Sequence, residues 1–330
     1  MHLLIPGGGG YVGSLLVPAL LNAGHFVTVY DLFLYGEDVF DSLREDERLT
    51  LIKGDIRNIE HVKRSMDGID AIIHLACISN DPSFELCPSL GKSINLDSFE
   101  PFVKAAKEMA IQRFIYASSS SVYGVKKVPN VTEEMELTPL TDYSKFKAEC
   151  EKILLHYQAP NFTCTILRPA TVCGYAPRQR LDVVVNILTN LAYHTGKIKV
   201  MGGEQLRPNI HINDMVRAYL HLLEAPEELI AGQIFNVGFQ NHSVKELGEI
   251  VKEVVGKKKR VDLELTPTDD HRSYHVSSNK IADHLGFKPR YTIQDAVLGL
   301  MQAFEEGKLP NSLVDKKYFN LKTMKEANLK

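Results

Sequence analysis

The sequence predicts an α/β protein with a doubly wound parallel sheet and a smaller C-terminal domain. Three observations predict this class. Short, continuous apolar runs alternate with helical stretches, a glycine-rich turn follows the first run, and the pattern becomes irregular after about residue 170. Apolar runs without polar alternation are typical of parallel strands that are buried on both faces. Repeated alternation of strands and helices is typical of a doubly wound sheet.

The elements follow in chain order. Strands are predicted over residues 2–5, 26–30, 50–52, 71–75, 113–117 and 163–167. Helices are predicted over 15–22, 102–109 and 144–156; the first ends at Gly24 and contains Pro18, which should kink it or mark its first turns. Residues 233–237 again resemble a buried strand. We therefore expect residues 1–172 to form the first domain with a returning strand near 233–238, and residues 173–330 to form mainly the second.

Composition and charge exclude several function classes. The 330 residues carry 38 Lys and Arg against 41 Asp and Glu, so the net charge is −3. We expect neither a nucleic-acid partner nor a membrane partner, because positive charge is not in excess and no apolar stretch approaches the ~20 residues of a transmembrane helix. The first predicted strand begins at residue 2, so we expect no signal peptide. Five scattered cysteines predict reduced thiols in a cytoplasm, and no metal site is expected.

The first motif with chemistry is Gly7-x-x-Gly10-x-x-Gly13, between the first strand and the first helix, with Tyr11 and Val12 inside it. Glycines here permit a tight turn and allow backbone N–H groups to approach a diphosphate at the start of a helix. Asp31 ends the second strand, 18 residues after Gly13. A carboxylate there accepts hydrogen bonds from ribose hydroxyls and repels a 2′-phosphate. This Rossmann-like pattern favours NAD over NADP.

Two further strand ends fit the same cofactor. Asp55 and Ile56 follow the third strand, where Asp55 could accept a hydrogen bond from an adenine amine; read alone, it is as easily a loop or helix-cap residue. The fourth strand ends in Leu75 and Ala76, against which a cofactor could lie.

The third motif is Tyr143-x-x-x-Lys147, preceded by a serine run over residues 118–121. A spacing of four places the two side chains on one helix face. A nearby ammonium favours the phenolate, so we expect the pKa of Tyr143 to fall towards neutral pH. A serine hydroxyl at the end of the fifth strand could then orient a substrate oxygen.

Together these motifs resemble the extended short-chain dehydrogenases/reductases, in particular the nucleotide-sugar epimerase and dehydratase family that includes UDP-glucose 4-epimerase-like enzymes. The resemblance covers nearly the whole chain, and it departs at Pro6, where the family usually has Thr. It implies that Ser119 is the catalytic hydroxyl, Tyr143 the base and Lys147 the group that lowers the base's pKa. It also implies that the substrate is a nucleotide-diphosphate sugar.

The resemblance assigns the remaining site residues as well. It implies that Asn95 and Pro169 lie near the cofactor and that Arg207 and Arg272 clamp the substrate's diphosphate, which suits the bidentate geometry of a guanidinium. Further candidates for contact with the sugar or its phosphate are Ser120, Ser121, Thr171, Arg178 and Arg180.

The two residues after Ser119 reduce the number of reactions that the resemblance leaves open. In the family, sugar 4,6-dehydratases carry Asp-Glu there, decarboxylating relatives carry Glu at the second position, and some epimerases acting beside the ketone carry Cys. This chain has Ser120 and Ser121, which are poor acids or bases without a partner. A 4-epimerase and a 4-dehydrogenase or 4-ketoreductase remain open. A non-catalytic dinucleotide sensor is disfavoured, because the catalytic set is complete.

The resemblance also implies a homodimer, in which two helices from each subunit form a four-helix bundle. Here those helices would lie near residues 100–109 and 144–156. Cys150, Ile153, Leu154 and Tyr157 recur at roughly helical spacing on the second of them. An apolar stripe of this kind is expected on a helix that forms a dimer interface and equally on a helix that packs into the core of its own chain.

Overall fold

The computed structural model describes residues 1–79, 81–126, 128–268, 273 and 275–327. Its main element is a seven-stranded sheet in the order β10-β6-β5-β4-β1-β2-β3, in which every neighbouring pair is parallel. The doubly wound prediction is therefore confirmed. The strands are β1 (His2–Pro6), β2 (Phe26–Asp31), β3 (Leu49–Lys53), β4 (Ala71–His74), β5 (Arg113–Ala117), β6 (Thr163–Pro169) and β10 (Gln233–Val237).

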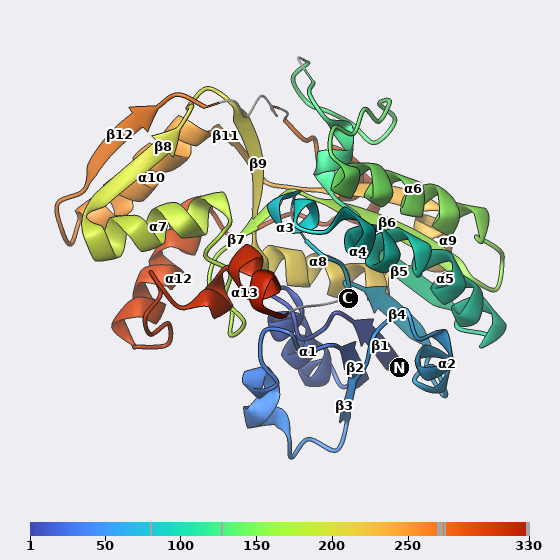
Figure 1. Cartoon of the computed structure of the whole chain (residues 1–330). Helices are drawn as coiled ribbons and strands as arrows, with labels where there is room; N and C mark the ends of the chain where they lie inside the picture. Colours follow the sequence, from blue (N-terminus) through green and yellow to red (C-terminus); the bar gives the residue numbers. More distant parts are fainter. Residues whose placement is uncertain (80, 127, 269–272, 274, 328–330) are drawn as a thin grey trace.

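Helices cover both faces of this sheet (Figure 1). Alternate residues of β1 explain why its sequence is apolar throughout: Leu3 and Ile5 face one hydrophobic cluster and Leu4 faces another. The first cluster contains α1 (Gly13–Asn22) and α8 (Ile212–Glu224); the second contains α2 (Ile59–Arg64), α5 (Phe99–Glu108) and α6 (Asp142–His156). The helix α1 continues through Pro18.

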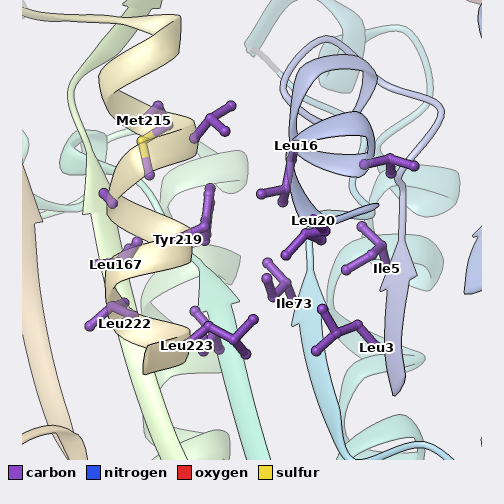
Figure 2. Packing of buried hydrophobic residues seen from close by; sticks show 14 of the residues in the cluster. Leu3, Ile5, Leu16, Leu20, Ile73, Leu167, Met215, Tyr219, Leu222 and Leu223 are labelled. Atoms are coloured by element: carbon purple, nitrogen blue, oxygen red, sulfur yellow. The ribbon is translucent and has the colours of Figure 1, made fainter. Parts of the chain in front are cut away.

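The helix α8 packs with the large sheet, although it lies far along the chain. Figure 2 shows Met215 and Tyr219 of α8 beside Leu16 and Leu20 of α1. The returning strand β10 was expected in this sheet, but the packing of α8 against α1 was not. Two shorter helices, α9 (Glu227–Ile230) and α11 (Asn279–Leu285), contact β6 and β10.

The remaining elements form a smaller group beside the sheet (Figure 1). Its strands are β7 (Thr171–Cys173), β9 (Leu206–His211) and β11 (Gln240–Ser243) in one sheet, and β8 (Lys197–Met201) with β12 (Asp262–Thr266) in another. The helices α7 (Val184–Thr195), α10 (Val244–Gly256) and α12 (Ile293–Glu305) pack around one hydrophobic cluster.

Short helices complete the chain. They are η1 (Asp38–Leu43), α3 (Asp81–Glu85), α4 (Pro88–Lys92), η2 (Ser93–Asp97), η3 (Ser120–Tyr123), η4 (Lys316–Tyr318) and α13 (Asn320–Ala327). The last of these, α13, lies against α3 of the larger part rather than extending away from the molecule (Figure 1). Over the described residues, none of the helices has the length and apolar character needed to span a bilayer.

Candidate functional site

A cavity of about 390 Å³ opens at the carboxyl ends of the central strands. The strand order reverses between β1 and β4, and ligands of doubly wound sheets bind at this kind of switch point. The cavity brings together most of the residues that the sequence singles out. They are Gly7, Gly10, Tyr11, Val12, Gly13, Asp31, Asp55, Ile56, Leu75, Ala76, Ser119, Tyr143, Lys147, Pro169, Thr171, Arg178 and Arg180.

The glycine-rich turn forms one wall of this cavity, and its geometry requires glycine. Gly7 has φ +79°, and a Cβ there would lie 2.5 Å from the backbone nitrogen of Ala76. A Cβ at Gly13 would lie 2.1 Å from the carbonyl oxygen of Gly8. At Gly10 the nearest atom would be the Gly7 carbonyl oxygen at 3.1 Å, so a side chain there would occupy cavity space. The turn is thus a cradle that fits a dinucleotide diphosphate at the start of α1.

Asp31 connects this turn to the end of β2. Its carboxylate accepts hydrogen bonds from the N–H groups of Gly9 at 2.9 Å and Phe33 at 2.8 Å. Burial raises the pKa of Asp31, and these two amides oppose the rise. The carboxylate therefore holds the turn in place while it lines the cavity.

Asp55 lines the cavity as expected but has a partner that the sequence analysis did not identify. The Arg57 guanidinium donates to its carboxylate at 2.6 Å and lowers the pKa of Asp55. One carboxylate oxygen also accepts from the Arg57 N–H at 2.9 Å.

The catalytic candidates meet at the end of β5. The backbone of Ser119 is extended, and its hydroxyl accepts a hydrogen bond from the N–H of Ser121 at 3.1 Å. This hydrogen bond caps the start of η3. Tyr143 and Lys147 lie in the first turns of α6, whose start is set by a capping box at Thr141. Lys147 Nζ donates to the Ala117 carbonyl at 2.6 Å and lies 5.9 Å from the centre of the Tyr143 ring.

The expected direction of the pKa shift at Tyr143 is wrong. Burial raises the pKa of the Tyr143 phenol well above its usual value, and the hydrogen bond with the Ser119 hydroxyl and the charge of Arg180 oppose this only in part. The Lys147 ammonium is directed to a carbonyl, and desolvation disfavours the phenolate more than the nearby charges favour it.

Three predicted residues lie outside the cavity lining. The Asn95 side chain accepts from the N–H of Ile78 at 2.8 Å and donates to its carbonyl at 3.0 Å, so it braces the segment after β4 and does not itself line the cavity. Ser120 is 2% exposed because η3 turns it inward. The Ser121 hydroxyl lies 2.8 Å from the Ser119 hydroxyl, outside the cavity lining. For these three residues, contact with the cofactor or the substrate stays a prediction.

The four arginines predicted for the substrate separate into different places. Arg207 lies on β9, outside the cavity lining, opposite His242 of β11. Arg272 lies outside the described residues. Arg178 and Arg180 line the cavity, and Arg180 forms an ion pair with Asp182 at 2.8 Å.

Several cavity residues have no motif in the sequence. Tyr35 follows β2, Cys77 follows β4, Tyr219 lies on α8, and Asn320 and Met324 lie on α13. Among these five residues, Cys77 could have been predicted from the sequence, because it directly follows Leu75 and Ala76. The others reach the cavity through long-range packing.

A buried ion pair supports the catalytic strand end from behind. Glu151 of α6 and Arg168 of β6 are each 3% exposed and approach to 2.6 Å. Ser118, which precedes the catalytic candidate, donates its hydroxyl hydrogen to the same carboxylate. The Arg168 guanidinium also donates to the Tyr123 hydroxyl at 2.7 Å.

Comparison with known proteins gives consistent matches. The model of the NAD-dependent epimerase/dehydratase family matches residues 3–238. UDP-glucose 4-epimerase of Corynebacterium glutamicum is 28% identical over 312 residues, covering 88% of this chain and 92% of that protein. dTDP-glucose 4,6-dehydratase of Streptomyces griseus is also 28% identical, over 90% of this chain and 92% of that protein.

Solved structures match as well. The UDP-glucuronic acid 4-epimerase of Bacillus cereus, in complex with UDP-glucuronic acid and NAD, superposes with a TM-score of 0.82 and 25% identity, covering 93% of this chain and 99% of that one. A dTDP-glucose 4,6-dehydratase of Streptomyces venezuelae has the same fold, with a TM-score of 0.83 and 23% identity over 93% of this chain and 98% of that one.

Proposed function

The chain belongs to the NAD-dependent epimerase/dehydratase family, and on that premise we propose that it is a nucleotide-sugar 4-epimerase acting through a 4-keto sugar. One observation carries this proposal: Ser119, Tyr143 and Lys147 line one cavity with the glycine-rich turn, while Ser120 and Ser121 follow Ser119 without a carboxylate. The similarity to the 4-epimerases of Corynebacterium glutamicum and Bacillus cereus supports it.

In this proposal Tyr143 takes the proton of the sugar C4 hydroxyl, and the Ser119 hydroxyl orients that oxygen by a hydrogen bond. A dinucleotide held by the glycine-rich turn, Asp31 and Lys147 would supply the hydride acceptor and donor that removal and return of the C4 hydrogen require. The Lys147 ammonium favours the phenolate of Tyr143 and contacts the cofactor's ribose. Arg207 and Arg272 bind the diphosphate of the nucleotide sugar.

Two other reactions use the same first step. A 4-dehydrogenase or 4-ketoreductase would release or take up the keto sugar, and nothing in the catalytic set distinguishes it from an epimerase. A 4,6-dehydratase is less favoured, because Ser120 and Ser121 replace the acidic pair. Dehydration is still one of the outcomes that the test distinguishes, because one relative is a dTDP-glucose 4,6-dehydratase. A non-catalytic sensor is least favoured.

The test is incubation of the purified enzyme with UDP-glucose, UDP-galactose, UDP-glucuronic acid and dTDP-glucose, each in D₂O, with products analysed by NMR. An epimerase interconverts C4 isomers without added NAD, accumulates no NADH and leaves deuterium out of the sugar carbons. A dehydrogenase accumulates NADH in proportion to product. A 4-keto-6-deoxy sugar carrying solvent deuterium would overturn the epimerase proposal in favour of a dehydratase.

We also propose a cytoplasmic homodimer that forms through α5 and α6. Cys150 and Leu154 are buried in the chain's own core, which leaves Ile153 and Tyr157 of the predicted stripe partly exposed for an interface. Sedimentation equilibrium of the wild-type protein and of Ile153→Lys tests this proposal. A wild-type monomer would overturn it.

A further inference from the structure

Arg178 belongs to the segment between β7 and α7, yet this segment is attached to the start of α1. The Tyr11 hydroxyl donates to the Gly174 carbonyl at 2.6 Å, and the Arg178 N–H donates to the Ser14 hydroxyl at 3.3 Å. Arg178 therefore comes from the smaller group of elements but lies beside the glycine-rich turn, and it lines the same cavity.

The Arg178 guanidinium is buried, with 6% of the residue exposed. One terminal nitrogen donates to the Asn320 side-chain oxygen at 2.5 Å, and the guanidinium carbon lies 3.6 Å from the centre of the Tyr35 ring. Its Nε has no hydrogen-bond partner among the described residues. Burial lowers the pKa of Arg178 to about 10, which still leaves the group charged at neutral pH.

The neighbouring acids compensate this cation only in part: Asp182 and Asp31 favour its charged form, yet burial still lowers the pKa of Arg178 below the ordinary arginine value. Asp31 accepts hydrogen bonds from two backbone amides, and Asp182 pairs with Arg180 at 2.8 Å. A buried guanidinium with an unpartnered N–H group is stabilised by an anion that accepts charge-assisted hydrogen bonds. The glycine cradle lines the same cavity and offers a place for such an anion, because a dinucleotide presents its diphosphate there.

The C-terminal helix holds this arrangement together. Asn320 accepts from Arg178, donates its amide to the Ser79 hydroxyl at 3.0 Å and donates its backbone N–H to Asp182 at 3.0 Å. One turn later, Met324 is buried in the hydrophobic cluster of the large sheet and lines the cavity. Figure 1 shows α13 between the large sheet and the smaller group of elements.

We propose that the C-terminal helix α13 is part of the NAD site: Asn320 and Tyr35 hold the Arg178 guanidinium in the cavity, where it binds the diphosphate of the dinucleotide. This places Arg178 at the cofactor rather than at the sugar or its phosphate. The carboxylate of Asp31 argues against the other phosphate that an arginine could meet, the 2′-phosphate of NADP. The inference rests on the NAD dependence of the family and is independent of the 4-epimerase proposal.

The test is calorimetric titration of the full-length protein, freed of dinucleotide, with NAD, NADP, ADP and adenosine; no sugar is needed. In Arg178→Met we expect the Kd for NAD and ADP to rise about 10- to 100-fold, as for loss of a hydrogen bond to a charged group, and the Kd for adenosine to change less than about 3-fold. Asn320→Leu should raise the Kd for NAD by about 3- to 10-fold. The double variant should show less than the product of the two effects, because both act through one guanidinium.

Three controls keep the result interpretable. Lys325→Ala changes an exposed residue on the same helix and should bind NAD like the wild type. Arg178→Lys keeps the charge and should lie between the wild type and Arg178→Met. The amount of NAD that stays bound through gel filtration is a second measurement. If Arg178→Met does not fold, the titrations of Arg178→Lys and Asn320→Leu replace it.

Four results would overturn the proposal. Unchanged NAD and ADP binding in Arg178→Met would exclude the diphosphate contact. An equal loss for adenosine and ADP would indicate a general effect on the pocket. A loss confined to NADP would assign Arg178 to a 2′-phosphate, and a loss confined to UDP, titrated in parallel, would assign it to the substrate.

Discussion

The buried ion pair between Glu151 and Arg168 gives a prediction whose size follows from the structure. Glu151→Gln removes the negative charge but keeps the shape of the side chain. The Arg168 guanidinium, which approaches the carboxylate at 2.6, 3.0 and 3.2 Å, then remains charged and 3% exposed. Removing one partner of a buried pair costs about 3–5 kcal/mol. Because the glutamine oxygen still accepts a hydrogen bond, we expect a loss of about 3 kcal/mol in the free energy of unfolding.

The assay is urea denaturation followed by circular dichroism, with Glu149→Gln as the matched control. Glu149 lies on the same helix and pairs with Lys152 at 3.1 Å, but these side chains are 50% and 72% exposed. Such a pair contributes less than about 1 kcal/mol. If Glu151→Gln loses no more stability than Glu149→Gln, the reasoning is refuted. A Glu151→Leu/Arg168→Met double variant should recover much of the loss, because it leaves no unpaired charge.

Three further predictions concern the cavity. Tyr143→Phe should lower turnover about 10²- to 10⁴-fold, because the base is lost, while bound NAD measured after denaturation stays at the wild-type level; retained turnover would exclude Tyr143 as the base. Burial already raises the pKa of Tyr143, and Lys147→Met should raise it further because the ammonium that favours the phenolate is lost. The rising limb of kcat/KM plotted against pH should then move to higher pH. An unmoved limb would contradict a role for the ammonium. Cys77 lines the cavity, so NAD should slow its alkylation by iodoacetamide, measured by peptide mass spectrometry, whereas exposed Cys87 should react at the same rate with or without NAD; equal rates for Cys77 would place it outside the occupied space.

The large sheet could be predicted because its signals are local. Strands buried on both faces need apolar residues at every position, so β1 and β5 are visible as uninterrupted runs. The glycine turn is equally local, since a side chain at Gly13 would collide with the carbonyl of Gly8 five residues earlier. The spacing of Tyr143 and Lys147 places both on one face of α6 whatever surrounds that helix.

Other parts of the site depend on contacts between distant segments. Asn320 lies 142 positions from Arg178 and 241 from Ser79, and no pattern within α13 indicates that it meets either residue. Ser120 looks like a site residue in the serine run, but η3 turns it into the core. Burial also reversed the expected direction of the pKa shift at Tyr143.

The sequence by itself determined the sheet, the glycine cradle and the choice of Ser119, Tyr143 and Lys147 as the proposed catalytic set, because each depends on residue type and short spacing. Only the tertiary structure decided which side chains share the cavity with that set. It brought Arg178 and α13 to the same cavity as the glycine turn and set the Asn95 side chain against the backbone of Ile78. The physical reason is that burial, charge pairing and desolvation are set by the whole packed molecule, and a side chain's chemistry follows from what surrounds it.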